Sequence, residues 1–187
     1  MLIRSARPED AAAVAAIYDP YVSESTVSFE YDAPSAAEIA RRMGELMPHY
    51  PWIAAEEDGV LLGYAYAGPH SSRQAYCWGA HLSVYVSDRA LGRGVGHELY
   101  GTLEKILFRQ GYHVLYGVVT GENDRSCRFH EAMGFIRRAE FPAAGFKHGK
   151  WLSTFWYEKR LRQEIPSEPP VSWHDLDLRD ILKGETI

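Results

Sequence analysis

Apolar and polar residues alternate along this chain with two different periods. Runs of period two, rich in Val, Tyr and Leu, predict strands, whereas apolar residues spaced three and four apart predict helices. Strands are expected over 2–6, on both sides of a turn at Asp58–Gly59, and over 76–87, 113–119, 136–142 and 150–161; helices are expected over 7–25, 35–50, 94–112 and 123–135. The order β-α-α-β-β-β-α-β-α-β-β predicts an α/β fold of the α+β kind, a central mixed sheet flanked by helices.

Local signals support several of these boundaries. Ser35 with Glu38 three residues later forms a capping-box pattern at the start of the second helix. Pro20 is expected to kink or end the first helix, and Gly111 to end the third. After Leu161 the composition changes and prolines cluster. We therefore expect one domain over 1–161 and a C-terminal tail over 162–187.

Composition narrows the class of protein. The chain has 187 residues, of which 46% are hydrophobic, enough for one domain with a substantial core. The formal net charge of −5 argues against a nucleic-acid partner. Cys77 and Cys127 are too few for a disulfide scaffold, and no metal-ligand spacing occurs, so no metal is expected. No apolar run is long enough to span a membrane, and we expect a cytoplasmic protein.

A glycine-rich turn, "LGRGVG" (Leu91–Gly96), lies between a predicted strand and a predicted helix. Backbone N–H groups at a helix start are unpaired, and together with the helix dipole they bind phosphate oxygens. Glycine allows the backbone to approach a bulky diphosphate closely. The P-loop spacing is absent, and the alternative is a tight turn without a ligand.

A second motif, "NDRSCRFHEAMGF" (Asn123–Phe135), follows the next strand. Asn123 is a good helix cap. Ser126 and His130 follow at i+3 and i+7, so the three lie on one helical face. Such a face suits a polar cleft, although a capped surface helix is the simpler alternative.

Together the two motifs resemble the GNAT superfamily of N-acetyltransferases. The blocks "IYDPYVSESTVSFEYDAP", "YPWIAAEEDGVLLGYAYAGP", "SVYV", "FHEAMGF" and "AAGFKHGKW" resemble the phosphinothricin and methionine sulfoximine N-acetyltransferases, over about Ile3 to Trp156. This resemblance implies a GNAT fold, acetyl-CoA as co-substrate, and a homodimer without membrane association. It also implies donor-binding residues, namely Val84, Tyr85, Val86, Gly92, Arg93, Gly94, Val95, Gly96, His97, Asn123 and Ser126.

His81 is the main departure from the subfamily, in which a glutamate at this place is the general base. A histidine whose pKa lies near its unperturbed value of ~6.5 can take an amine proton without burial to tune it. Three interpretations stay open. His81 is the base; His81 orients the substrate while the base is elsewhere or water serves; or catalysis is weak and the chain is an acyl-CoA-binding sensor or interaction module.

The remaining roles follow from the chemistry of acyl transfer. The backbone N–H groups of Val84 and Tyr85 are predicted to stabilise the oxyanion. His130 stands where many GNAT enzymes have a tyrosine, and is the predicted proton donor to the CoA thiolate. The predicted function is transfer of acetyl from acetyl-CoA to the α-amine of a small amino acid by direct attack, with a different small amine as an alternative acceptor. Candidate substrate-binding residues are Phe29, Tyr31, Arg73, Tyr76 and Lys147.

Overall fold

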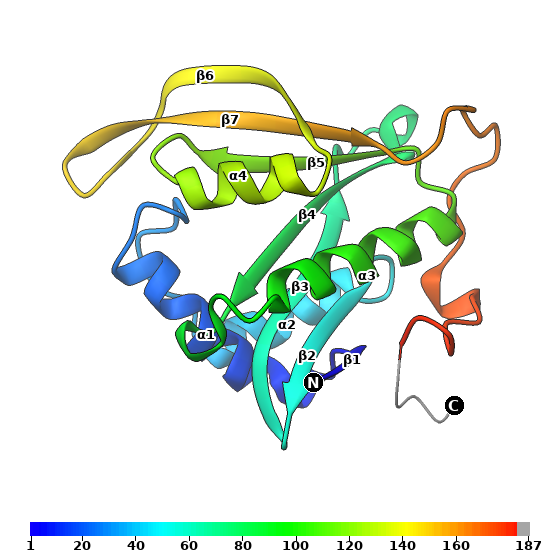
Figure 1. Ribbon diagram of the computed structural model, residues 1–187, viewed down its shortest axis with the longest axis horizontal. Helices are drawn as coiled ribbons and strands as arrows, with labels where there is room; N and C mark the ends of the chain where they lie inside the picture. Colours follow the sequence, from blue (N-terminus) through cyan, green and yellow to red (C-terminus); the bar gives the residue numbers. More distant parts are fainter. Residues whose placement is uncertain (183–187) are drawn as a thin grey trace.

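The computed structural model describes residues 1–182 and contains one seven-stranded mixed sheet (Figure 1). The strands lie in the order β1-β2-β3-β4-β5-β7-β6, and only β4 and β5 pair in parallel. The predicted mixed sheet is therefore confirmed. The strand bounds are β1 Leu2–Ser5, β2 Trp52–Glu57, β3 Val60–Pro69, β4 Gly79–Val86, β5 Val114–Thr120, β6 Ile136–Lys147 and β7 Lys150–Arg160.

Helices cover both faces of the sheet. Side chains at alternate positions of β4 point to opposite faces of the sheet, so they pack against different helices. Leu82 and Val86 pack with the helix α3 (Val95–Gln110), and Tyr85 packs with α1 (Ala11–Ser23). The remaining helices are α2 (Ala36–Leu46), beside α1, and α4 (Asp124–Ala132), which packs on β5 and β6.

The local sequence signals produce the expected boundaries. The Ser35 side chain accepts a hydrogen bond from the Glu38 backbone N–H at the start of α2. Gly111 ends α3 with a left-handed φ of 102°. Pro20 lies in the last turns of α1 and the helix continues to Ser23. The β6 strand is longer than its sequence predicts, because it keeps pairing with β7 beyond an irregular stretch between Phe141 and Gly145.

The strands β4 and β5 are paired at one end and diverge at the other. Their register covers only Gly79–His81 against Val114–Tyr116. In Figure 1 the two strands meet on the right and separate towards the left, with α4 beside β5; α3 packs against β3 and β4. The separation leaves the β5-facing edge of β4 without a strand partner beyond His81.

The segment after β7 packs against the rest of the chain. The Trp173 indole N–H donates to the Met47 carbonyl at 2.8 Å, and the Val171 backbone N–H donates to the Gln110 carbonyl. The division into a domain and a tail stays a prediction, and residues 183–187 lie outside the described residues. Among residues 1–182 no helix is both long enough and apolar enough to cross a bilayer.

Candidate active site

A cavity of about 890 Å³ lies between α3 and α4, at the point where β4 and β5 diverge. Most of the predicted donor-binding residues are on its wall. They come from three places: Val84 and Val86 on β4, Gly92 and Gly94–His97 in the turn and first helical residues, and Asn123 and Ser126 at the start of α4. Tyr85 and Arg93 are not among the lining residues.

The glycine turn presents the start of α3 to the cavity. Gly92 and Gly94 have φ values of 77° and 80°, a region that residues with a Cβ rarely adopt. An added Cβ at either position would meet nothing within 4 Å, so the turn is open on this side. Arg93 does not contribute its charge here, because its guanidinium pairs with Glu57 at 2.6 Å.

The other wall is α4, which begins at the predicted cap. The Asn123 side-chain oxygen accepts a hydrogen bond from the Ser126 backbone N–H at 3.0 Å. Arg125 and Arg128 also line the cavity. These two arginines are not among the residues predicted from the sequence, although their i, i+3 spacing places them on the same side of the helix. They add positive charge opposite the glycine turn.

The free edge of β4 offers a backbone donor at Val84, a residue that lines the cavity. Ser87 donates to the Leu62 carbonyl, so alternate residues of β4 pair with β3. This alternation directs the N–H of Val84 towards the gap and that of Tyr85 towards β3. The structure thus contradicts the expectation that Tyr85 shares in an oxyanion site. At Val86 both backbone groups are within hydrogen-bond distance of the Tyr21 hydroxyl.

His81 lies at the closed end of the gap, on the face of the sheet opposite α3. Its Nε2 is 3.2 Å from Nδ1 of His70, and its ring packs edge-on against Trp156. Burial lowers the pKa of His81 to about 4, with a smaller contribution from repulsion between the rings of His81 and His70 when both are protonated. The expectation of an unperturbed histidine was therefore wrong. The ring is neutral at physiological pH and available to accept a proton.

His130 is in the core and not on the cavity wall. Its Nδ1 lies 2.8 Å from the Ser126 carbonyl and its Nε2 lies 3.1 Å from the Tyr100 hydroxyl. The side chain is 6% exposed, and burial lowers its pKa. The carbonyl accepts the Nδ1 proton, so Nε2 accepts from Tyr100. This arrangement contradicts a direct role for His130 as proton donor to a thiolate.

Three of the predicted substrate residues meet where the loop after α1 contacts the end of β6. The Tyr31 hydroxyl donates to the Phe146 carbonyl, and the Phe29 ring lies over Gly145. Lys147 is 2% exposed, and its Nζ donates to two backbone carbonyls in this region. The structure contradicts Lys147 as the counter-ion of a substrate carboxylate, because its buried ammonium group already donates hydrogen bonds to two backbone carbonyls.

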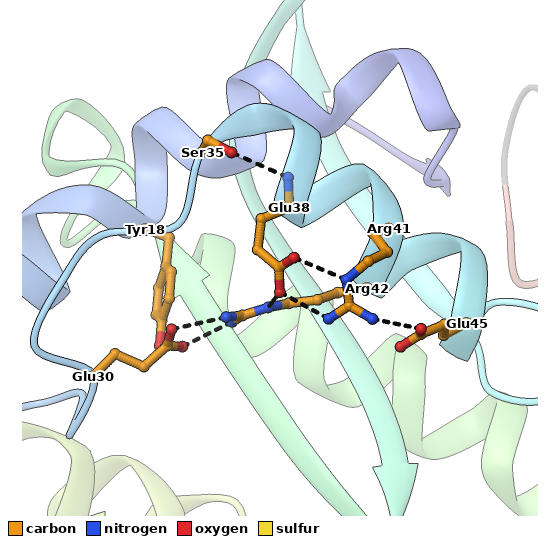
Figure 2. A network of polar contacts seen from close by, with 7 residues as sticks. All are labelled: Tyr18, Glu30, Ser35, Glu38, Arg41, Arg42 and Glu45. Atoms are coloured by element: carbon orange, nitrogen blue, oxygen red, sulfur yellow. Dashed lines mark hydrogen bonds and ion pairs between the residues drawn. The ribbon is translucent and has the colours of Figure 1, made fainter.

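The same loop is tied to α2 by a network of charged groups (Figure 2). The Glu30 carboxylate accepts two hydrogen bonds from Arg42, at 2.8 and 2.9 Å, and one from the Tyr18 hydroxyl at 2.9 Å. Figure 2 shows Glu38 bridging Arg41 and Arg42 on one side of the helix. The loop that carries Phe29 and Tyr31 is thus held from two sides.

The other two predicted substrate residues lie between β3 and β4. Arg73 and Tyr76 are both exposed, in and beside a short helical turn over Gln74–Tyr76. Tyr76 stands edge-on to His70, with ring centroids 5.6 Å apart. This segment therefore lies next to His81, and Arg73 is the exposed cation of the predicted set.

The cavity fits the co-substrate that the sequence motifs imply. A diphosphate is complementary to the helix start and to Arg125 and Arg128. The arm of acetyl-CoA needs an extended edge with free backbone groups, which β4 supplies. His81 lies on this same strand, three residues before Val84. The roles of the Val84 N–H as oxyanion donor and of His81 as proton acceptor stay predictions.

Proteins named as acetyltransferases are similar to this chain in sequence and in structure. A sequence profile described as "Acetyltransferase (GNAT) domain" matches residues 3–156. The phosphinothricin N-acetyltransferase of Streptomyces viridochromogenes is 38% identical over 167 residues, 89% of this chain and 91% of that protein. The L-methionine sulfoximine/L-methionine sulfone acetyltransferase of Salmonella typhimurium is 30% identical, over 86% of this chain and 95% of that protein.

A solved structure agrees with these sequence relatives. The crystal structure of a GNAT superfamily phosphinothricin acetyltransferase from Sinorhizobium meliloti, in complex with AcCoA, superposes with a TM-score of 0.85. It is 31% identical and covers 89% of this chain and 91% of its own. On the evidence of the profile match, the relatives and the shared architecture, the chain belongs to the GNAT acetyltransferase family.

Proposed function

We propose that this GNAT acetyltransferase transfers the acetyl group of acetyl-CoA to the α-amine of a small free amino acid of the phosphinothricin or methionine sulfoximine type. The observation that carries the proposal is the cavity between α3 and α4, which is lined by Val84 and Val86 of β4, the strand that also carries His81. The relatives named for these two substrates cover most of the chain. Their names are those of transferases, which favours an active enzyme over a sensor.

The chemistry is a direct attack of the amine on the thioester carbon. An α-amine is mostly protonated at neutral pH, so a base must take one proton before or during attack. His81 has this role, because its ring is neutral and lies at the closed end of the gap. The N–H of Val84 stabilises the oxyanion that forms. The carbon–sulfur bond then breaks, the nitrogen loses its remaining extra proton as the amide forms, and the CoA thiolate takes up that proton and leaves as the thiol.

The residues that would bind the amino-acid acceptor favour a small anionic substrate. The tethered loop after α1, with Phe29 and Tyr31, and the segment with Arg73 and Tyr76 both border the His81 side of the sheet. A carboxylate in such a site needs a paired cation, because an unpaired buried charge is costly. Arg73 is this cation, and Lys147 is not.

The experiment is an acetyl-CoA consumption assay across free amino acids, simple amines, a lysine peptide and an aminoglycoside. Anionic or strongly polar amino acids are expected to give the highest kcat/KM. Arg73→Ala is expected to raise KM for the anionic acceptors much more than for neutral amines, without changing acetyl-CoA affinity. A far better rate with the peptide or the aminoglycoside overturns the acceptor class and leaves the donor site intact.

The proposal includes a homodimer in the cytoplasm that works without nucleic acid or membrane. Exposed aromatic side chains on β6 and β7, namely Phe141, Phe146 and Trp151, support a protein-protein contact on that hairpin. Both cysteines are free, which suits a reducing compartment. Light scattering on the purified chain tests the dimer, and a monomer at micromolar concentration contradicts it.

A further inference from the structure

A second histidine is in direct contact with His81. His70 follows β3, and its Nδ1 lies 3.2 Å from Nε2 of His81, with ring centroids 5.2 Å apart. The register of β3 and β4 explains this contact, since Gly68 stands opposite His81 and Pro69 opposite Ala80. His70, the first residue after β3, therefore lies over the start of β4.

The position of His70 is fixed by its neighbours. Its ring stacks on Tyr116 of β5, with centroids 4.1 Å apart and planes at 23°. Tyr76 and Trp156 meet it edge-on. Gly79 leaves room beneath, because a Cβ there would meet Tyr116 at 3.1 Å and His70 at 3.4 Å. Half-buried and packed on these sides, the ring has little freedom to turn away from His81.

The contact determines which nitrogen of His81 can work as a base. Two neutral imidazoles share one proton between the facing nitrogens. If His70 donates that proton, Nε2 of His81 is the acceptor, Nδ1 carries the other proton, and no lone pair is left for a substrate. If His81 donates through Nε2, its Nδ1 lone pair is free. Within residues 1–182 the only hydrogen bond recorded for the His81 ring is the one to His70.

We propose that His70 is a positioning residue, which accepts the Nε2 proton of His81 and so keeps the Nδ1 lone pair of His81 directed at the acceptor amine. The amine proton then moves to Nδ1, and the imidazolium retains its Nε2 hydrogen bond to Nδ1 of His70. An orienting partner on one ring nitrogen leaves the other nitrogen free to take a proton, as a base of this kind requires. This inference rests on the proposed function, in which His81 takes the proton.

Two variants separate the hydrogen bond from the packing. His70→Phe keeps a ring against Tyr116 and removes the acceptor. His70→Asn places a carbonyl oxygen near the site of Nδ1 and restores an acceptor. His70→Phe is expected to lower kcat roughly 10- to 100-fold, with small changes in the KM of the amino acid and in acetyl-CoA affinity. His70→Asn is expected to recover most of the lost rate. His49→Phe, at an exposed histidine after α2, is the matched control.

A measurement without turnover separates this inference from the proposed function. The ¹⁵N shifts of the His81 ring report which nitrogen carries the proton, whether or not any amine is acetylated. The proton is expected on Nε2 in the unmodified protein and in His70→Asn, and distributed over both nitrogens in His70→Phe. A proton fixed on Nδ1 of His81 overturns the inference. So does a folded His70→Phe variant with unchanged kcat, or a His81→Ala variant that loses less activity than His70→Phe.

Discussion

His130 of α4 occupies the space that a side chain of Gly117 on β5 would fill. A Cβ at Gly117 would lie 2.5 Å from Nε2 of His130 and 2.7 Å from its Cδ2. The imidazole is therefore seated directly on the backbone of β5. There it stacks on Tyr157 and meets the Tyr100 hydroxyl. The contact fastens α4, which forms one wall of the cavity, to the sheet.

Gly117→Ala is expected to destabilise the fold by about 1–3 kcal/mol, the usual cost of forcing extra volume into a packed interior. The added methyl group must displace His130 or move α4. Chemical denaturation measures the change in the free energy of unfolding. Gly44→Ala, in an open stretch of α2, is the matched control and is expected to be neutral or stabilising. Equal stability of both variants would show that His130 is not held as described.

Replacing His81 tests the base directly. His81→Ala is expected to lower kcat/KM roughly 10²- to 10⁴-fold, the usual contribution of a general base. His81→Glu is expected to retain part of the activity. Steady-state kinetics with the best acceptor measure kcat/KM for both variants. Full activity of His81→Ala at every pH tested would place the base elsewhere.

The pH dependence follows from the lowered pKa of His81. The base works only when neutral, and its pKa of about 4 keeps it neutral from pH 5 upwards. Activity that depends on His81 is thus retained as pH falls through 6.5 and lost only as pH falls through about 4. The expected kcat/KM profile has no limb near 6.5 that belongs to His81. An acid limb there that disappears in His81→Glu would contradict the burial argument.

Gly96 provides a test of the donor cavity without backbone strain. It lies inside α3, where a side chain is tolerated, and a Cβ there would meet Val86 at 3.6 Å and Phe129 at 3.7 Å. Gly96→Leu is expected to fill the cavity and weaken CoA binding sharply while the fold persists. Calorimetry measures the affinity, and Gly44→Leu on α2 is the control. Unchanged affinity would remove the glycine turn from the donor site.

Arg125 and Arg128 are expected to bind the phosphates of the donor. Substituting either by Ala is expected to raise the Kd for CoA roughly 10-fold, the equivalent of one charge-assisted hydrogen bond of about 1.5 kcal/mol. The loss is expected to shrink at high salt, because exposed charges are screened. Arg41→Ala, on exposed α2, controls for the change of net charge. Identical salt dependence in all three variants would exclude phosphate contacts.

Lys147 is expected to be structural. Lys147→Met leaves the carbonyls of Val22 and Ser28 without their donor and is expected to cost about 1–3 kcal/mol of stability. The ratio of kcat/KM between anionic and neutral acceptors is expected to stay the same. A selective loss for anionic acceptors would restore Lys147 to the substrate site.

The order of elements was determined by the sequence itself. Period-two and period-3.6 patterns are local, and so are the caps at Ser35 and Asn123 and the turn at Asp58–Gly59, whose residues have φ values of 51° and 78°. The glycine turn could also be predicted from the sequence, since glycines at the start of a helix are a local feature. These signals depend on neighbouring residues along the chain, so no tertiary contact was needed to interpret them.

Only the tertiary structure decided what the individual polar residues do. His81 and His130 carry the same side chain, yet one meets His70 at the end of the β4–β5 gap and the other fills the place of a missing Gly117 side chain. The Lys147 ammonium group donates hydrogen bonds to backbone carbonyls that lie more than a hundred positions away in sequence. Strand pairing brings such partners together, and burial then sets their pKa values and occupies their hydrogen bonds. The pKa shifts and the hydrogen bonds do not produce a periodic pattern in the sequence. Both arise between residues that are far apart along the chain and come into contact only in the folded sheet.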